Sequence, residues 1–360
     1  MGQKLPSVPS ILGENAVALV AWQDQLYQEA ATMKAVLTAV TAALALLNLS
    51  VGVADELQTK DLAARIELRA FQSLTLTDQQ FLTGDKNGSP VTIAGELRLP
   101  QGSSGRVPVV IVLHGAGGLG PSNELWSRVL NEIGIATFSV DTNSGRNLVS
   151  ISTNQGSLGF FVYTLDAYRA RDLLASHPRI DPDRIAVMGT SRGGRGALYA
   201  SLKRFRDTWA SGKDFAAYIP LYAACESPSI IGEQDVSDNP IRQFHGGSDD
   251  VVAIGPCKKF YDRLRAVGKD ATLTEFAGVG HLFDNPAAPK GLKRVNIQTM
   301  RSCDVKEGSA GVLVNVSTRQ PFTWDDPCVE TDTHVGYDDA AMRATHAAVK
   351  DFLGRVFKLN

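Results

Sequence analysis

Ser191 lies between glycines in the segment GTSRG, residues 189–193. The apolar run Ile185 to Met188 precedes it and apolar residues at helical spacing follow, so the pattern predicts a strand, a sharp turn and a helix. Glycines two positions before and after the serine leave room for a strained turn that exposes the hydroxyl as a nucleophile. The alternative is a glycine-rich turn in which the serine only caps the helix.

A serine nucleophile needs a general base that takes its proton, and a carboxylate that orients the base. The segment FHGGSDD places Asp249 and Asp250 after a predicted strand, Ile241 to His245, and GVGH places His281 after a second, Ala271 to Phe276. Open α/β sheets bind their ligands at such strand ends. Serine, acid, histidine is also the chain order in α/β-hydrolases, so these residues predict a catalytic triad.

A glycine-rich turn is a fourth feature of the predicted active site, beside the serine, the acid and the histidine. The predicted strand Val107 to Leu113 is followed by HGAGG, residues 114–118, and by a helix that begins near Pro121. In esterase-like enzymes such a turn contributes one backbone N–H to the oxyanion hole, and the residue after the nucleophile contributes the other. We therefore expect the oxyanion hole at the N–H groups of Ala116 and Arg192.

The same turn also supports a different class of protein. Residues 115–120, GAGGLG, form a G-x-G-x-x-G motif after a strand, and Asp141 ends the next predicted strand. These are the glycine and acidic positions of a dinucleotide-binding fingerprint, so an NAD-dependent oxidoreductase is the alternative function. That alternative leaves the turns carrying Ser191, Asp249 and His281 unused. A non-catalytic binding protein on the same scaffold is a third class.

Composition agrees with one enzyme domain. The chain has 360 residues, 44% of them hydrophobic, and a net charge of −2, so it can bury a large core and has no basic field for nucleic acid. Alternating strand and helix patterns from Leu68 onward favour a mostly parallel sheet with helices on both faces. We expect a catalytic domain over residues 55–360. An irregular segment, residues 285–335, either walls the active site or is inert surface.

Residues 1–54 are interpreted as a leader. Met33 and the lysine after it precede an uncharged apolar stretch that ends in small residues, Gly52 to Ala54, as in a signal peptide cleaved before Asp55. The stretch is short for a membrane span. We expect a periplasmic or secreted protein without a stable membrane anchor after processing. A membrane anchor over residues 35–54, a buried structural helix and a cytoplasmic location are the alternatives.

The four cysteines fit an exported protein. Cys225 follows a predicted strand and Cys257 opens the helix after the Asp249 turn, so neighbouring parallel strands bring both to one end of the sheet. Cys303 and Cys328 both lie in the irregular segment. Two disulfides are expected, although four cysteines allow three pairings and four reduced thiols are the alternative. No Cys or His pair has the spacing of a metal site.

Together, several segments resemble the dienelactone hydrolase family of α/β-hydrolases: VVIVLHGAGG, ATFSVDTNSGRN, HPRIDPDRIAVMGTSRGG, LYAACESP, HGGSDDVVAIGPC and GVGHLFDN. The resemblance covers roughly Leu68 to Leu359. It implies an α/β-hydrolase fold and hydrolysis of an ester or lactone through an acyl-enzyme, without metal or organic cofactor. The family's acid lies three residues after the first glycine of its turn, which selects Asp249. Founding members carry cysteine where this chain has Ser191, so a general carboxylesterase is implied.

The partner implied is a small-molecule ester or lactone. Short loops follow the strand ends, so we expect a small, open pocket that prefers short acyl groups. Gly117 is expected to border the substrate. Arg146 or Arg192 is expected to bind a substrate carboxylate, unless these arginines, like Arg195, pair with acids such as Asp166. Nothing in the sequence indicates an oligomeric state.

Overall fold

The computed structural model describes residues 65–102, 105–226 and 228–359. The leader predicted over residues 1–54, with its signal-peptide-like stretch, lies outside these ranges. Within them, no helix combines the length and the apolar character needed to span a membrane.

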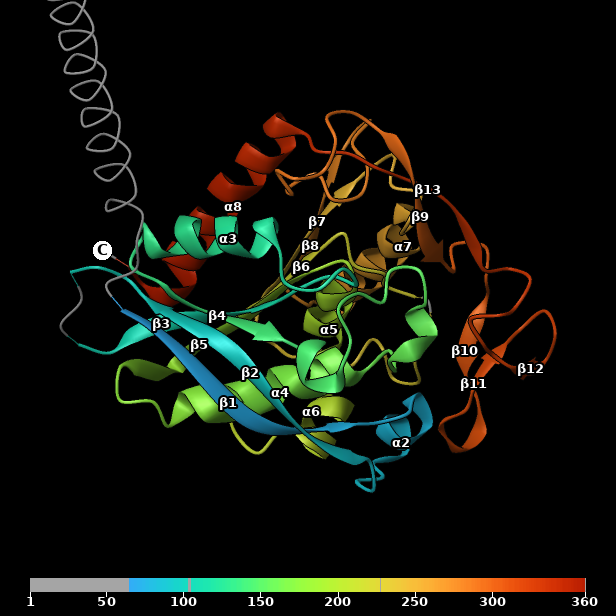
Figure 1. Cartoon of the computed structure of the whole chain (residues 1–360), viewed down its shortest axis with the longest axis horizontal. Helices are drawn as coiled ribbons and strands as arrows, with labels where there is room; N and C mark the ends of the chain where they lie inside the picture. Colours follow the sequence, from blue (N-terminus) through green and yellow to red (C-terminus); the bar gives the residue numbers. More distant parts are fainter. Residues whose placement is uncertain (1–64, 103–104, 227, 360) are drawn as a thin grey trace, which may run out of the picture. The chain divides into compact units, whose positions relative to one another are not determined.

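An eight-stranded sheet forms the centre of the described region (Figure 1). Strand β2 is antiparallel to both of its neighbours, β1 and β4, and all the remaining pairs are parallel. Across the sheet the strands are β1 (Arg65–Thr75), β2 (Ser89–Leu99), β4 (Ala136–Asp141), β3 (Val107–Leu113), β5 (Ile180–Thr190), β6 (Tyr218–Leu221), β7 (Ile241–Gly246) and β8 (Ala271–Phe276).

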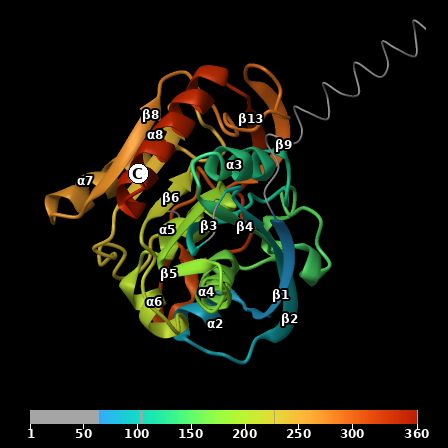
Figure 2. The ribbon, with the colours of Figure 1, turned by 90° about the vertical axis from the view of Figure 1, so that its left-hand side faces the viewer.

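Helices cover both faces of the sheet (Figures 1 and 2). Helices α3 (Pro121–Asn131) and α8 (Asp339–Phe357) lie on one face, and α4 (Val162–Ala175) and α6 (Lys203–Trp209) lie on the other. The remaining helical elements are α2 (Asp78–Thr83), α5 (Arg192–Tyr199), α7 (Ile254–Ala266) and the short 3-10 turns η1 (Ser144–Arg146), η2 (Gln155–Ser157) and η3 (Ser309–Gly311). The fold is the α/β-hydrolase fold predicted from the sequence.

Strand β3 shows why both faces must be covered. All seven of its residues are buried, and alternate residues belong to two hydrophobic cores. Val109 and Ile111 pack into the core that contains α4, and Val110 packs into the core that contains Trp126 of α3 and Phe352 of α8. A parallel strand covered on both faces is therefore a continuous apolar run rather than an alternating one.

The structure differs from the predicted strand bounds at two places. Strand β5 begins at Ile180 rather than Ile185, because Ile180 pairs with Val107 across an irregularity in register. The polar residues between them hide this pairing in the sequence. The predicted strand before Cys225 ends early, at Leu221, because Tyr222 has a φ of 37°.

The irregular segment, residues 285–335, forms short strands and is called the insertion below. Strand β9 (Lys293–Thr299) pairs with β13 (Glu330–Val335), and β10 (Val305–Glu307), β11 (Leu313–Asn315) and β12 (Gln320–Pro321) form a three-stranded sheet. Strands of two to seven residues, separated by turns, give little periodic signal.

Two disulfides confirm the prediction from the cysteines. Cys225, after β6, is bonded to Cys257 of α7, and Cys303 is bonded to Cys328 within the insertion. The first bond connects two elements beside the sheet, and the second closes a loop around β10 to β12. Disulfides of this kind are typical of extracellular and periplasmic proteins.

Candidate active site

Ser191 occupies the sharp turn between β5 and α5. Its φ of 52° and ψ of −113° are rare for a residue with a side chain. A Cβ on Gly189 would lie 2.2 Å from the carbonyl oxygen of Gly193, and a Cβ on Gly193 would lie 2.4 Å from that of His114. The Ser191 N–H donates to the carbonyl oxygen of Leu221 at 2.9 Å, which fixes the turn to β6. The glycine spacing in the sequence thus reflects close backbone packing.

The structure brings Ser191, His281 and Asp249 into one chain of hydrogen bonds. His281 Nε2 lies 2.9 Å from Ser191 Oγ, and His281 Nδ1 lies 2.7 Å from Asp249 Oδ2. The second carboxylate oxygen, Oδ1, accepts hydrogen bonds from the N–H groups of Val251 at 3.0 Å and Val252 at 2.8 Å. With its proton held on Nδ1 by the carboxylate, a neutral imidazole presents Nε2 as the acceptor toward Ser191.

A second histidine supports Asp249. His245 Nε2 lies 3.4 Å from Asp249 Oδ2 and 2.9 Å from the carbonyl oxygen of Val252, and its Nδ1 lies 3.0 Å from the amide nitrogen of Gln243. Burial alone would raise the pKa of Asp249, but the charge of His281 and hydrogen bonds from His245 and His281 hold that pKa below its ordinary value. The sequence analysis missed His245, although it directly precedes the glycine turn that carries the acid.

Asp250 points away from Ser191. Its two carboxylate oxygens accept hydrogen bonds from the backbone N–H and the Nδ1 of His334, at 2.7 and 2.8 Å. Arg301 Nη1 also lies 3.5 Å from Asp250. Adjacent residues of an extended turn face opposite ways, so Asp249 contacts His281 and Asp250 contacts the insertion.

The turn after β3 lies directly beside Ser191. A Cβ on Gly115 would lie 3.5 Å from Ser191 Cβ, and the carbonyl oxygen of Ala116 accepts a hydrogen bond from the N–H of Ile151 at 2.8 Å. Arg192 is the first residue of α5, so its N–H has no carbonyl acceptor within the helix. Ala116 therefore lines the same cavity as Ser191, and Arg192 follows Ser191 directly at the start of α5.

His114 holds this turn in place. It is fully buried, and its Nε2 accepts a hydrogen bond from the N–H of Thr142 at 3.1 Å. Its Nδ1 lies 2.6 Å from the carbonyl oxygen of Gly115. Burial lowers the pKa of His114, so the neutral ring with its proton on Nδ1 satisfies both contacts. The role of His114 is structural and was not predicted.

A cavity of about 130 Å³ opens at Ser191 and His281. Ala116 and Gly117 line it, and so does Ile297 of the insertion. Gln298, Met300 and Trp324, also from the insertion, line a smaller adjoining space that Ser191 shares with Arg192 and Arg195. The insertion therefore walls the site rather than forming inert surface.

A buried carboxylate connects the loops around this cavity. Asp284 is fully buried and follows His281 by three residues. It accepts hydrogen bonds from Ser122 Oγ at 3.0 Å, Trp126 Nε1 at 2.7 Å and Tyr222 OH at 2.6 Å. The Tyr222 ring in turn packs edge-on against His281, with 4.6 Å between ring centroids.

The Asp284 network therefore joins three parts of the site. Ser122 and Trp126 belong to α3, the helix that follows the glycine turn, and Tyr222 follows β6 beside the Ser191 turn. An isolated buried carboxylate is costly, and several donors offset that cost. The sequence analysis did not identify Asp284, because its partners lie far away in the chain.

The expectation that Arg146 binds a substrate carboxylate is wrong. Its guanidinium is 3% exposed and forms a bidentate ion pair with Asp166, with N–O distances of 2.8 and 2.9 Å. The remaining N–H groups donate to Thr75 Oγ1 and to the carbonyl oxygens of Leu74 and Thr142. All five donors of Arg146 are thus satisfied inside the fold, which is the ion-pairing alternative named above.

Arg192 and Arg195 lie beside Ser191 but are buried. Arg192 Nη1 donates to Gln155 Oε1 at 2.9 Å, and its Nη2 donates to the carbonyl oxygen of Leu158. The guanidinium carbons of Arg192 and Arg195 lie 5.0 and 4.8 Å from the ring centroid of Phe160. Burial, and the charge of Arg195, lower the pKa of Arg192 to about 10.

A known protein family matches most of this chain. The family model "Dienelactone hydrolase family" matches residues 93–357. The chain belongs to the dienelactone hydrolase family. The matched region contains the turns that carry Ser191, Asp249 and His281. No curated protein gives a significant match.

Several solved structures are similar to this chain. A dienelactone hydrolase-like promiscuous phosphotriesterase, P91 from metagenomic libraries, is 20% identical, with 81% of this chain and 99% of that chain covered and a TM-score of 0.52. A structure named m3DLH gives 20% identity, the same coverage and a TM-score of 0.53. An esterase of Thermogutta terrifontis, Est2, is 16% identical, with 54% and 82% covered and a TM-score of 0.44.

The chain is therefore a hydrolase of the esterase-like class, as a member of the dienelactone hydrolase family with that family's α/β-hydrolase fold.

Among the residues that the structure describes, no group of three or more His, Cys, Asp or Glu side chains is arranged to hold a metal ion.

Proposed function

We propose that this protein is a serine carboxylesterase that cleaves small or short-acyl esters, or lactones, through an acyl-enzyme. The observation that carries the proposal is the continuous hydrogen-bond chain from Ser191 through His281 to Asp249, at 2.9 and 2.7 Å, with the serine on a strained turn. Nucleophile, base and orienting acid in this geometry are the parts that acyl transfer requires.

The proposed reaction has two steps. Ser191 Oγ attacks the carbonyl carbon of the ester and gives its proton to His281 Nε2, and the bond to the alcohol oxygen then breaks as that oxygen takes the proton from His281. In the second step water gives a proton to His281 and attacks the acyl-enzyme, which releases the acid and restores the Ser191 hydroxyl. Asp249 keeps the imidazole oriented and stabilises its cationic form in both steps.

The negative charge on the substrate oxygen is assigned to the N–H groups of Ala116 and Arg192. Their backbone positions are held by the hydrogen bond to Ile151 and by the start of α5. Gly117 borders the same space. A cavity of about 130 Å³ at the nucleophile suits a short acyl group better than a long one.

The oxidoreductase alternative has less support. Five of the six residues of the motif GAGGLG line the cavity at Ser191. The Asp141 carboxylate, expected to bind a ribose, accepts hydrogen bonds from the N–H groups of Asn143 and Ser144 at 3.1 and 2.9 Å. Both features are better explained by a hydrolase turn.

Covalent labelling tests the proposal. A fluorophosphonate probe should label the wild type at Ser191, and hydrolysis of p-nitrophenyl acetate should be lost in parallel with labelling. Labelling at another residue, or full esterase activity without labelling, contradicts the assignment. An NAD(H) fluorescence titration should give no saturable change.

We further propose that the protein is exported to the periplasm or secreted. The two disulfides support an oxidising environment, and the leader prediction places the start of the mature chain near Asp55. N-terminal sequencing of protein from its native host, with thiol counting before and after reduction, tests both points. A retained Met1 with four free thiols contradicts export.

A further inference from the structure

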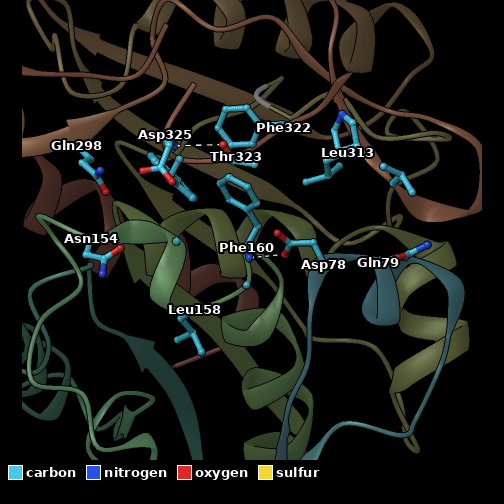
Figure 3. A pocket seen from close by; sticks show the side chains of 15 residues that line it. Asp78, Gln79, Asn154, Leu158, Phe160, Gln298, Leu313, Phe322, Thr323 and Asp325 are labelled. Carbon is cyan, nitrogen blue, oxygen red and sulfur yellow. Dashed lines mark hydrogen bonds between the residues drawn. The ribbon is translucent and has the colours of Figure 1, made fainter. Parts of the chain in front are cut away.

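A second, larger cavity adjoins the Ser191 site and is not used by the proposed reaction. It measures about 470 Å³ and lies between the first turn of α2, the loop from Asn154 to Phe160 and the insertion (Figure 3). Gln298 and Trp324 line both this cavity and the small space that contains Ser191. We call this cavity the aromatic cleft. The aromatic cleft and the Ser191 site therefore share two wall residues.

Three aromatic rings form one wall of the aromatic cleft. Phe160 lies 6.2 Å from Phe322 and 5.5 Å from Trp324 between ring centroids, and Phe322 lies 5.8 Å from Trp324. Phe160 is buried, whereas Phe322 and Trp324, both from the insertion, are partly exposed. These contacts hold the rings in place, so an apolar face is preformed for a ligand.

Polar side chains lie around these rings. Figure 3 shows the carboxylates of Asp78 and Asp325 and the amides of Asn154 and Gln298 around the cavity. Carboxylates accept hydrogen bonds only, and amides both donate and accept. Such a mixture recognises hydroxyl groups, which also donate and accept. A ligand with several hydroxyls and a flat apolar face matches both the polar side chains and the aromatic rings.

Charged groups of both signs lie near the aromatic cleft. Arg192 and Arg195 do not line it, but both guanidinium groups lie over the Phe160 ring, and Arg192 is also 5.9 Å from the Trp324 centroid. Burial raises the pKa of Asp78 to about 6, and the two guanidinium groups oppose that rise, so Asp78 is mostly ionised at neutral pH. Two buried cations near the Phe160 ring thus oppose the charge of Asp78. A neutral ligand is favoured over an anion or a cation.

We propose that the aromatic cleft binds a neutral carbohydrate ring, and that the substrate is an acylated sugar whose short acyl group lies in the 130 Å³ cavity at Ser191. The inference rests on the proposed esterase function. The ester bond between the acyl carbon and the sugar oxygen breaks, and the sugar leaves as the free alcohol with the proton carried by His281 Nε2.

A matched pair of acetate esters tests the sugar contact. Methyl 6-O-acetyl-β-D-glucopyranoside and cyclohexylmethyl acetate both release a primary alcohol on a six-membered ring, but only the first carries hydroxyls. The wild type should hydrolyse the sugar ester with a kcat/KM at least about tenfold higher. Phe322→Ala and Asp325→Asn should each lower that ratio by about tenfold, mainly through KM for the sugar ester.

The controls separate recognition from folding. Val267→Ala removes a surface side chain that is 57% exposed, on the C-terminal side of α7, and should leave the substrate ratio at the wild-type value. Thermal melting of each variant identifies any general loss of folding. Equal losses on both esters in Phe322→Ala and Asp325→Asn overturn the proposal, as does a wild-type preference for acetylcholine or acetylsalicylate over the sugar ester.

Binding without turnover distinguishes this inference from the proposed function. Ser191→Ala should bind methyl β-D-glucopyranoside with a saturable change in tryptophan fluorescence, and that change should disappear in the double variant Ser191→Ala, Trp324→Phe. Sugar binding together with full esterase activity in Ser191→Ala would overturn the proposed nucleophile and leave the sugar site standing. Absence of saturable binding in an inactive Ser191→Ala protein overturns the sugar site alone.

Discussion

The candidate active site combines the C-terminal ends of the sheet strands, called the sheet edge here, with the insertion, whose strands are short and irregular. At the sheet edge, strands β5, β7 and β8 end in turns that place Ser191, Asp249 and His281 within hydrogen-bond distance of one another. In the insertion, short strands and a disulfide place Ile297, Gln298 and Trp324 along the walls of the cavities. Under the proposed function, the sheet performs the chemistry and the insertion selects the substrate. Variants at the sheet edge should change kcat, and variants in the insertion should change KM.

Removal of the nucleophile should have the largest effect. Ser191→Ala is expected to lower kcat for p-nitrophenyl acetate by about 10⁶-fold, because members of a triad act as one unit. Titration with a fluorophosphonate measures the fraction of labelled protein alongside the rate. Residual activity near the wild-type value would mean that the chemistry lies elsewhere.

The two adjacent aspartates give the next largest effect and a matched control. Asp249→Asn should lower kcat by about 10⁴-fold, since the histidine would lose its orienting carboxylate. Asp250→Asn changes the same chemical group one residue later, but its partners are His334 and Arg301 of the insertion, so its kcat should change only a few-fold. The reverse ranking would assign the acid to Asp250.

The lowered pKa of Asp249 also predicts that the stability of the fold depends on pH. Its pKa in the folded protein lies below the ordinary value of 3.8, so its ionised form stabilises the fold above that pH and the contribution is lost as the pH falls through the folded value. The gap in Tm between the wild type and Asp249→Asn should therefore narrow as the pH is lowered from about 6 to about 3. Thermal melts across this range measure the gap, and a widening gap contradicts the sign.

Asp284 tests whether the loops around the triad act together. Asp284→Asn places an amide N–H₂ among three hydrogen-bond donors, so we expect kcat to fall by about 10- to 100-fold with a lower Tm. Tyr222→Phe removes only one of these hydrogen bonds and should have a smaller effect on both quantities. A drop in Tm without any change in kcat would make the network structural only.

The disulfide of the insertion should affect substrate selection more than chemistry. Cys303 and Cys328 are 25 residues apart, and removing a crosslink of this span costs about 3 kcal/mol in the loop-entropy model. The double variant Cys303→Ser, Cys328→Ser should therefore have a lower Tm and a raised KM, with kcat for p-nitrophenyl acetate reduced less than KM is raised. A fall in kcat alone would contradict the division between sheet and insertion.

Acyl chain length gives the smallest expected effect. A methylene that stays in water contributes none of the roughly 0.8 kcal/mol that it would yield when buried. Across p-nitrophenyl esters of increasing length, kcat/KM should therefore stop rising beyond short acyl groups. A steady rise toward long chains would show that the insertion opens a larger acyl pocket than the cavity at Ser191.

Local patterns determined the parts of this protein that lie at strand ends. The glycine spacing around Ser191, the FHGGSDD turn and the GVGH turn each depend on backbone geometry within a few residues, and parallel pairing then brings the three turns to one edge. The order and type of most elements, the α/β-hydrolase fold and the two disulfides followed from such patterns. The continuous apolar run of β3 is a further example, because burial on both faces removes the alternation of side chains.

Only the tertiary structure decided which charges pair and what walls the site. Arg146 of η1 pairs with Asp166 of α4, Asp284 accepts hydrogen bonds from α3 and from the residue after β6, and Trp324 reaches the site from an insertion whose short strands have no periodic signal. These partners belong to different elements of the fold, and a charged side chain pairs with whichever opposite charge the fold brings near it. Residue type and local spacing do not encode that choice, because it depends on how distant elements pack.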